Sequence, residues 1–172
     1  MDPGLFEQTV LPHLNAAYNL SRWMTRNSDD AEDVAQEAYL KAFRSFQTCQ
    51  ATTAEETRAW LLAIVRNTCL TWLRKRGAAS MTEFDEETHT DRELTPDGES
   101  ALLNQAALDH LNGCVEGLPP EFREAIVLRE IEELPYKEVA GIAGVPIGTI
   151  MSRLARARRR LQDCMTARRG TA

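Results

Sequence analysis

Hydrophobic residues recur every three or four positions along most of this chain, which is the spacing of amphipathic α-helices. The clearest run covers residues 30–46, where small and aromatic apolar side chains share one face for about four turns. The same spacing predicts helices over residues 5–26, 54–76 and 101–116, and a further helix that begins at 118–121. Pro12 interrupts the first of these helices, which is therefore expected to start or to kink there. Few segments favour strands, so the pattern predicts an all-α fold.

Short-range signals mark several helix ends. Asn27 belongs to a break whose residues are good N-caps for the helix over 30–46. Thr53 and Glu56 have the spacing of a capping box for the next helix. That helix is expected to end in a cationic run followed by Gly77, because cations suit the C-terminal dipole and glycine suits the position beyond it.

Residues 134–161 predict two helices separated by a tight turn. Gly144 ends a short helix with an apolar face, and Pro146 suits the start of a longer basic helix. The longer helix has an apolar stripe: Ile147, Ile150, Leu154, Ala157 and Leu161. Its opposite face is small and polar at first and cationic further on: Gly148, Thr149, Ser152, Ala155, Arg156 and Arg159. Such a helix fits the DNA major groove, so we predict a helix-turn-helix rather than a helical hairpin with a merely solvated basic face.

The charge of the chain is strongly uneven, although its net value is −6. Residues 78–100 contain eight acids and one arginine, whereas residues 151–172 contain seven arginines and one acid. The sign of the local charge, and not the net charge of the chain, governs contact with nucleic acid. Residues 78–100 also lack periodicity, so they are interpreted as a flexible acidic linker between domains over residues 1–77 and 101–172.

Two further features suggest contact surfaces. The polar face of the helix over 30–46 contains Asp33, Gln36, Glu37 and, unexpectedly, Leu40. A single exposed leucine is common, but flanked in this way it could centre a protein–protein contact, and the sequence leaves both readings open. Trp60 is expected in the core, whereas Trp72 lies beside a basic helix end and could stack on a base.

The sequence offers little for catalysis, metal binding or membrane insertion. It contains no nucleophile–base pair, metal cluster or glycine-rich phosphate loop, so we do not expect an enzyme. Its cysteines share no CxxC spacing and are expected to be reduced thiols in a cytoplasmic protein: Cys49, Cys69, Cys114 and Cys164. His110 and Cys114 lie one turn apart, but two ligands do not make a structural zinc site, so no metal or cofactor is predicted. No apolar run is long enough to span a membrane.

Three segments together resemble a known family: DAEDVAQEAYLKAFRSF, RAWLLAIVRNTCLTWLRKR and LPPEFREAIVLREIEELPYKEVAGIAGVPIGTIMSRLARARRRL. In this order and at this length they are similar to bacterial RNA polymerase sigma factors of the extracytoplasmic-function (ECF) class. The resemblance covers nearly the whole chain. It implies a region-2-like domain over residues 1–77, a linker that threads toward the active-site and RNA-exit channels, and a region-4-like domain over residues 101–172.

The resemblance also implies a function and roles for particular residues. The protein would bind core RNA polymerase, direct it to promoters and be held inactive by an anti-sigma factor, often a membrane-bound one. The surface for the clamp helices of core polymerase would be Asp33, Gln36, Glu37 and Leu40. The residues that recognise and open the downstream element would be Asn67, Thr71, Trp72, Arg74, Lys75 and Arg76. The upstream element would be read or held by Thr149, Ser152, Arg153, Arg156, Arg159 and Arg160.

The chain departs from the family pattern at three places. The recognition helix has Met151 where a cation is usual, and Ala155 where a large side chain is common. The base-capturing loop has no aromatic residue near Cys49. These differences concern which promoter is read, not the class of function. The alternative function is a stand-alone helix-turn-helix regulator, which would need a ligand pocket or a self-complementary face.

Overall fold

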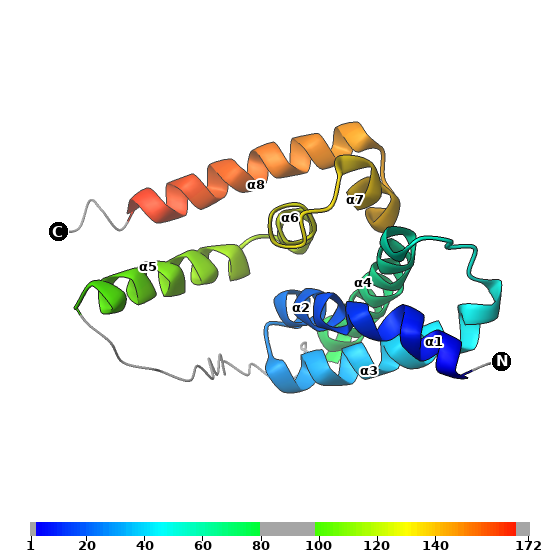
Figure 1. Cartoon of the computed structure of the whole chain (residues 1–172). Coiled ribbons are helices and arrows are strands. Elements are labelled where there is room, and N and C mark those ends of the chain that lie inside the picture. The colour runs from blue at the N-terminus through cyan, green and yellow to red at the C-terminus, as the bar shows by residue number, and fades with distance from the viewer. Residues whose placement is uncertain (1–2, 80–98, 168–172) are drawn as a thin grey trace.

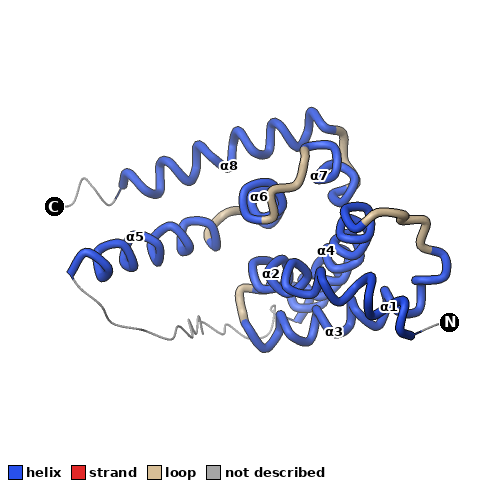
Figure 2. The backbone as a smooth tube through the Cα atoms, in the orientation of Figure 1, coloured by secondary structure: helices blue, strands red, loops and turns tan. Residues whose placement is uncertain are grey.

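The computed structural model describes residues 3–79 and 99–167, and all regular elements in these ranges are helical (Figures 1 and 2). The first range contains α1 (Pro3–Val10), η1 (Leu11–His13), α2 (Leu14–Thr25), α3 (Ser28–Ser45), η2 (Phe46–Thr48) and α4 (Ala54–Ala79). The second contains α5 (Glu99–Glu116), α6 (Pro120–Ile126), the π-helical turn η3 (Val127–Ile131), α7 (Tyr136–Ala143) and α8 (Ile147–Ala167). The prediction of an all-α fold is confirmed for these residues.

Local side chains set the helix ends as predicted. The Asn27 side chain accepts a hydrogen bond from the Asp30 amide at 3.0 Å and caps α3. Thr53 and Glu56 form the predicted capping box, because each side chain accepts a hydrogen bond from the other residue's amide. Gly144 ends α7 in the left-handed conformation with φ of 67°.

The interruption predicted at Pro12 is confirmed, whereas one predicted helix end is wrong. Residues 5–26 are divided into two α-helices by the 3₁₀ turn at Leu11–His13, since Pro12 cannot donate a helical hydrogen bond. The expectation that Gly77 lies beyond the end of its helix is wrong, because α4 continues through Gly77 to Ala79. A glycine in open space lowers helix propensity by only about 1 kcal/mol, which a long packed helix tolerates. Residues 80–98 of the predicted linker lie outside the described residues.

The N-terminal helices pack α2, α3 and α4 around an apolar core. Phe6 from α1 closes one end of this core and is 1% exposed. Its ring meets the rings of Tyr39, Phe43 and Phe46 edge-on, at centroid distances of 5.0, 5.0 and 5.1 Å. These aromatic residues of α3 and η2 therefore hold α1 in place.

The C-terminal helices place α8 across α5, α6 and α7 (Figure 1). Ile150, Leu154 and Ala157 are fully buried there, as the predicted stripe requires. Ile147, at the start of that stripe, is instead 41% exposed because it occupies the first turn of α8. α7, the turn at Gly144 and α8 form the predicted helix-turn-helix.

The two groups of helices contact each other directly, α4 with α7 and α2 with α6. Arg123 of α6 is 5% exposed and donates to the carbonyl oxygens of Trp23 and Met24 at 3.1 and 3.4 Å. Burial lowers the pKa of the Arg123 guanidinium to about 10, so this side chain stays charged at neutral pH. No helix in the described ranges is both long and apolar enough to cross a membrane.

Candidate functional site

The arginines of α8 divide into two groups. Arg158 pairs with Glu130 of η3, and Arg160 lies 5.4 Å over the Phe122 ring of α6. These two side chains therefore attach α8 to its own domain. Arg160 was predicted to contact DNA phosphate, and the structure gives it a packing role in addition.

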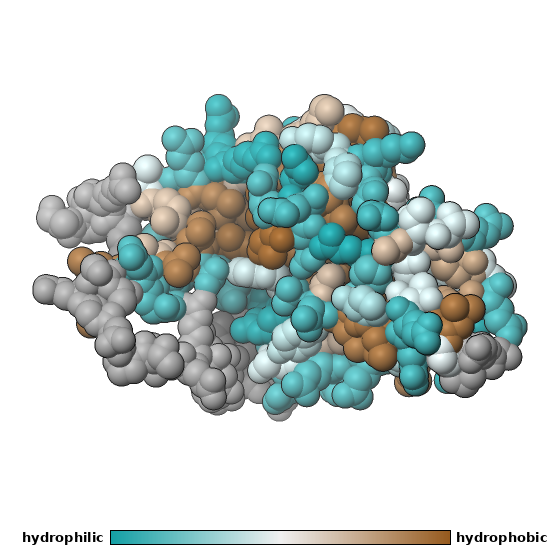
Figure 3. Space-filling view, viewed as in Figure 1, coloured by the Kyte–Doolittle hydropathy of each residue, from teal (hydrophilic) through white to brown (hydrophobic). Residues whose placement is uncertain are grey.

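Arg153, Arg156 and Arg159 form the second group. Arg156 and Arg159 are exposed, Arg153 is half-buried, and none of the three forms an ion pair with a described residue. Near the start of α8, Ser152 is exposed and Thr149 is half-buried, and the Ser152 hydroxyl donates to the Thr149 carbonyl at 3.0 Å. Hydrophilic residues cover the α8 ridge in Figure 3. The three arginines of this face can therefore enter a major groove without first breaking an ion pair to any described residue.

The exposed face of α3 borders an apolar groove. Asp33, Gln36, Glu37 and Leu40 are all exposed, and Leu40 retains 54% of its surface. Gln36 and Leu40 line a groove of about 470 Å³ whose other walls are Leu14, Tyr18, Glu32, Ala35 and Tyr39. An exposed leucine at the rim of an apolar groove is typical of a protein-binding surface. Leu40 is therefore part of a continuous feature, which its position in the sequence did not reveal.

Glu37 gives this surface a fixed negative charge. The Lys41 ammonium one turn later pairs with the Glu37 carboxylate at 2.7 Å. The hydrogen bond from Lys41 lowers the pKa of the Glu37 carboxyl below its usual value. The carboxylate therefore stays ionised at neutral pH and offers acceptor atoms to a basic partner.

The downstream-element residues lie along the second half of α4. Asn67 is exposed, and its side-chain amide makes no hydrogen bond to any described residue. Thr71 lies one turn further on, and its hydroxyl donates to the Asn67 carbonyl at 3.0 Å. Arg74 and Lys75 are exposed and continue this face toward the end of α4. This part of the predicted set shares one side of one helix.

Trp72 and Arg76 are more constrained than the sequence suggested. The Trp72 ring is half-buried against the core, and the Arg76 guanidinium lies 5.0 Å above it. Arg76 also pairs with the Asp30 carboxylate of α3 at 2.7 Å. A base could stack on Trp72 only after Arg76 has moved. Arg66 of α4 pairs with Glu124 of α6, because α4 lies against the C-terminal helices.

The loop before α4 borders a separate cavity of about 620 Å³. Cys49 and the loop residues after it form one wall, and α1 and η1 form the other through Leu5, Pro12 and His13. Asn67 lies more than three helical turns beyond this loop, about 20 Å along α4. The structure therefore does not bring the loop and Asn67 into one compact pocket.

The cysteines depart from the predicted reduced state. Cys114 of α5 and Cys164 of α8 form a disulfide, with Cα atoms 6.0 Å apart. The prediction of four free thiols is thus wrong for this pair, because helix packing joins two positions that share no sequence spacing. His110 also reaches the pair, so helix packing gathers three potential metal ligands and not only the two that lie one turn apart in sequence. Cys49 and Cys69 are free.

Two family profiles match this chain over the two groups of helices. The profile described as Sigma-70 region 2 matches residues 9–79, and that described as Sigma-70 region 4 matches residues 108–161. The first match contains the α3 surface and the α4 face described above. The second contains the helix-turn-helix.

Similar proteins span most of the chain. The ECF RNA polymerase sigma factor SigE of Mycolicibacterium smegmatis is 35% identical over 92% of this chain, and the match covers 60% of that relative. The ECF sigma-E factor of Haemophilus influenzae is 34% identical over 84% of this chain and 78% of its own length.

A solved structure shows the same arrangement of helices. The sigma factor RpoE of Bartonella quintana, solved in complex with the anti-sigma factor NepR, matches with a TM-score of 0.75 and 29% identity. That match covers 94% of this chain and 96% of RpoE. CnrH, solved with the cytosolic domain of CnrY, shares the fold with a TM-score of 0.64. The chain therefore belongs to the ECF class of RNA polymerase sigma factors and is a transcription initiation factor.

Proposed function

We propose that this protein binds core RNA polymerase through α3 and directs it to promoters through α4 and α8, under the control of an anti-sigma factor. The helices up to the end of α4 form the domain for core binding and downstream-element melting, the segment between α4 and α5 is the linker, and the helices from α5 onward form the domain for upstream recognition. The protein acts in the cytoplasm and catalyses no reaction itself, since nucleotide addition belongs to the core enzyme. The observation that carries this proposal is that one sigma-factor fold has an apolar groove and a basic helix face whose arginines pair with no residue in the described ranges.

The α3 surface supports core binding. Leu40 and the groove beside it provide apolar area, whereas Asp33 and Glu37 provide negative charge around it. An apolar centre with a polar rim is the usual anatomy of a protein interface. Helical partners fit a groove of this kind with side chains spaced by one turn.

The two DNA surfaces have different chemistry. Arg156 presents a guanidinium that pairs with no described residue on the groove-facing side of α8, where it can form two hydrogen bonds with one guanine. Asn67 presents an amide that is unbonded within the described ranges and can both donate to and accept from an exposed base edge. Arg74 and Lys75 on the same face of α4 would hold the phosphate backbone. The cavity beside the Cys49 loop is large enough to receive an unstacked base.

An anti-sigma factor has a suitable surface on α5. Leucine side chains remain exposed along this helix, with exposed fractions from 37% to 70%: Leu102, Leu103, Leu108 and Leu111. Hydrophobic colour lies between α5 and α8 in Figure 3. Exposed apolar area of this extent is typical of a protein-interaction site. RpoE of Bartonella quintana was solved with such a partner, and we extend that partnership to this chain.

The change Leu40→Asp tests the core-binding surface. It places a charge in an apolar contact and is expected to weaken core binding by about 2 kcal/mol or more, roughly thirtyfold. Helicity should be unchanged because Leu40 lies outside the core. Binding to core polymerase would be measured by titration, and promoter-directed transcription by a run-off assay.

Leu103→Asp is the matched control, since Leu103 is an even more exposed leucine on α5. It should leave core binding unchanged and reduce anti-sigma binding. Equal core affinity for Leu40→Asp and the wild type would reject α3 as the polymerase surface. A protein that binds DNA but never co-purifies with core polymerase would favour the stand-alone regulator.

A further inference from the structure

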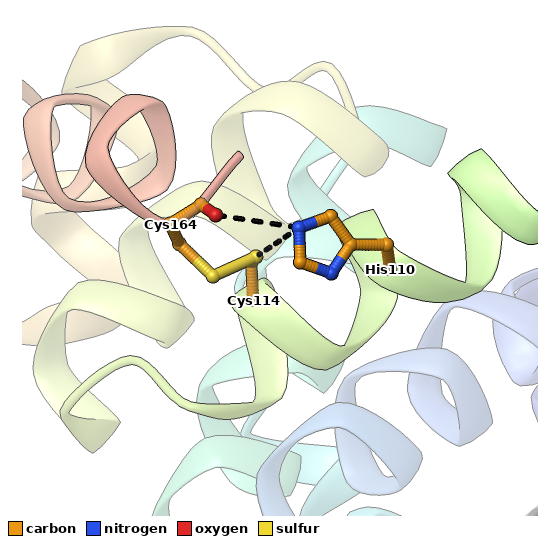
Figure 4. Close-up of side chains that lie close together, drawn as sticks. All are labelled: His110, Cys114 and Cys164. Atoms are coloured by element: carbon orange, nitrogen blue, oxygen red, sulfur yellow. Dashed lines mark hydrogen bonds between the residues drawn. A yellow bond between two sulfur atoms is a disulfide. The ribbon is translucent and has the colours of Figure 1, made fainter. Parts of the chain in front are cut away.

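Three potential metal ligands meet where the C-terminal halves of α5 and α8 pack together (Figure 4). We propose that His110, Cys114 and Cys164 bind a thiophilic divalent cation such as Zn²⁺ in the reduced protein. The disulfide between Cys114 and Cys164 is then the oxidised, metal-free state of the same site. The promoter function described above does not depend on this site.

The distances already approach those of a metal site. One ligand atom from each residue lies within 4.8 Å of the others, and Nε2 of His110 is 3.9 Å from Sγ of Cys114. Ligand atoms around tetrahedral Zn²⁺ are about 3.3–3.8 Å apart, since the metal lies about 2.0–2.3 Å from each. Breaking the disulfide therefore has to separate the sulfurs by less than about 2 Å for the cation to fit. Small side-chain rotations provide this without unfolding either helix.

The chemistry of the three groups also selects such a cation. Two thiolates and one neutral imidazole are a preferred donor set for Zn²⁺. Their charges cancel that of the divalent cation, which suits a place where Cys114 is only 6% exposed. His110 and Cys164 are half-buried, so a water molecule can reach the fourth position. The Met165 thioether, 4.0 Å from Sγ of Cys114, adds another soft neighbour.

The backbone pre-arranges the ligands. His110 and Cys114 are separated by four residues and share one face of α5. With the disulfide formed, Nε2 of His110 also lies 3.3 Å from the Cys164 carbonyl oxygen, so the imidazole is already directed toward α8. Cys114 and Cys164 are 50 positions apart in sequence. The metal or the disulfide therefore connects the first and last helices of the second domain.

Oxidation exchanges one connection for the other. A hydroperoxide accepts two electrons from the two thiolates, and its O–O bond breaks. The products are one alcohol and one water, or two waters when the oxidant is hydrogen peroxide. The two oxygen leaving groups take their protons from solvent. The S–S bond forms, and Zn²⁺ leaves as the hydrated ion because a disulfide offers no thiolate ligand. The α5–α8 connection is lost only when the thiols are both reduced and metal-free.

Zinc binding by the full-length reduced chain tests this proposal. The chain would be reduced with a phosphine, stripped of metal and titrated with Zn²⁺ against a chromophoric chelator. We expect about one Zn²⁺ per chain and a higher melting temperature on binding. Co²⁺ should give the thiolate charge-transfer absorption of a cysteine-ligated site. Hydrogen peroxide should release the Zn²⁺ while two thiols disappear from an Ellman titration.

Single substitutions identify the ligands. Cys164→Ser and His110→Ala should each weaken Zn²⁺ binding by roughly tenfold or more, and circular dichroism would confirm that each variant folds. Cys49→Ser is the matched control, because Cys49 is a free cysteine outside the cluster, and it should bind Zn²⁺ as the wild type does. Wild-type affinity in Cys164→Ser or His110→Ala would overturn the proposal. Loss of two thiols to peroxide in a chain that never binds Zn²⁺ would also overturn it, leaving a disulfide only.

Discussion

Side chains of one type differ in this protein according to what surrounds them, and the arginines of α8 illustrate this. Arg158 and Arg160 are engaged within the domain, whereas Arg156 and Arg159 are exposed. Arg156 is one turn beyond Ser152 on the groove-facing side, and Arg159 lies further along. We therefore expect base recognition from Arg156 and phosphate contact from Arg159.

Arg156→Ala should relax upstream-element preference by about 1–3 kcal/mol, because a bidentate guanine contact is lost. Arg159→Ala should weaken binding to all sequences alike. It should also reduce the slope of log affinity against log salt concentration by about one. Holoenzyme binding across a panel of upstream sequences, at several salt concentrations, measures both effects. An equal loss of affinity at every upstream sequence for Arg156→Ala would contradict its role in base recognition.

The two free cysteines also differ. Burial, assisted by the charge of Glu124, raises the pKa of the Cys69 thiol to about 12. Cys49 is half-exposed in the loop before α4. Only Cys49 should react with a soluble alkylating reagent in the native protein, because a buried protonated thiol is a poor nucleophile.

The raised pKa makes stability depend on pH in the alkaline range. The folded chain keeps the Cys69 proton above pH 9.0, the unperturbed value, whereas the unfolded chain loses it. The stabilisation that the Cys69 thiol gives the folded chain is therefore complete below pH 9.0 and is lost as the pH rises toward about 12. Relative to Cys69→Ala, the free energy of unfolding should fall by about 2 kcal/mol between about pH 8 and pH 10.5. Parallel denaturant curves for both proteins would measure it, and an unchanged difference would contradict the assignment.

At the scale of elements, α4 combines three environments along its length. Its first turn is capped by Thr53 and borders the loop cavity, and its middle is buried against α2 and α3. Its second half presents Asn67 and Thr71 to solvent. One rigid helix can therefore transmit a displacement at its DNA-facing side to the rest of the domain.

Asn67→Ala should reduce promoter opening and leave stability within about 0.5 kcal/mol of the wild type, because the Asn67 amide makes no internal hydrogen bond among the described residues. Asn27→Ala is the matched control with the opposite result. It removes the cap of α3 and should cost about 1 kcal/mol of stability.

A fluorescent base analogue in the downstream element, with holoenzyme assembled from each variant, reports opening directly. Chemical denaturation of the free chain reports stability. An undiminished opening signal for Asn67→Ala would reject it as the residue that captures the base.

At the scale of the whole molecule, ion pairs with buried carboxylates and half-buried arginines join the two groups of helices. Arg66 of α4 pairs with Glu124 of α6, and Arg58 of α4 pairs with Glu132 beside η3, each at 2.5 Å. Glu124 and Glu132 are 2% and 7% exposed. A buried carboxylate that loses its partner is strongly destabilising, so these pairs couple the domains.

Arg66→Met should therefore loosen the domain contact while the helices on each side stay folded. The expected result is a larger radius of gyration by small-angle scattering and faster proteolysis between α4 and α5. Arg76→Ala is the control, since the Arg76–Asp30 pair lies within the N-terminal helices and is largely exposed. Arg66→Met with the wild-type radius and protease resistance would show that this pair does not hold the domains together.

The sequence by itself determined the helical class, the helix-turn-helix and most helix ends. These features depend on residues three or four positions apart, such as Asn27 with Asp30 and Thr53 with Glu56, or on single residues such as Gly144. Helical periodicity similarly placed Leu40 on an exposed face, because burial of one stripe leaves the opposite one in solvent. The family resemblance extended this reading to both domains.

Only the tertiary structure decided which distant residues meet. Arg66 and Glu124 are 58 positions apart, Arg58 and Glu132 are 74 apart, and Cys114 and Cys164 are 50 apart. No local spacing encodes such contacts, since they arise when whole helices pack through surfaces that each expose several alternative side chains. For this reason Cys164 was expected to be an isolated thiol, and only the packing of α8 against α5 showed its pairing with Cys114.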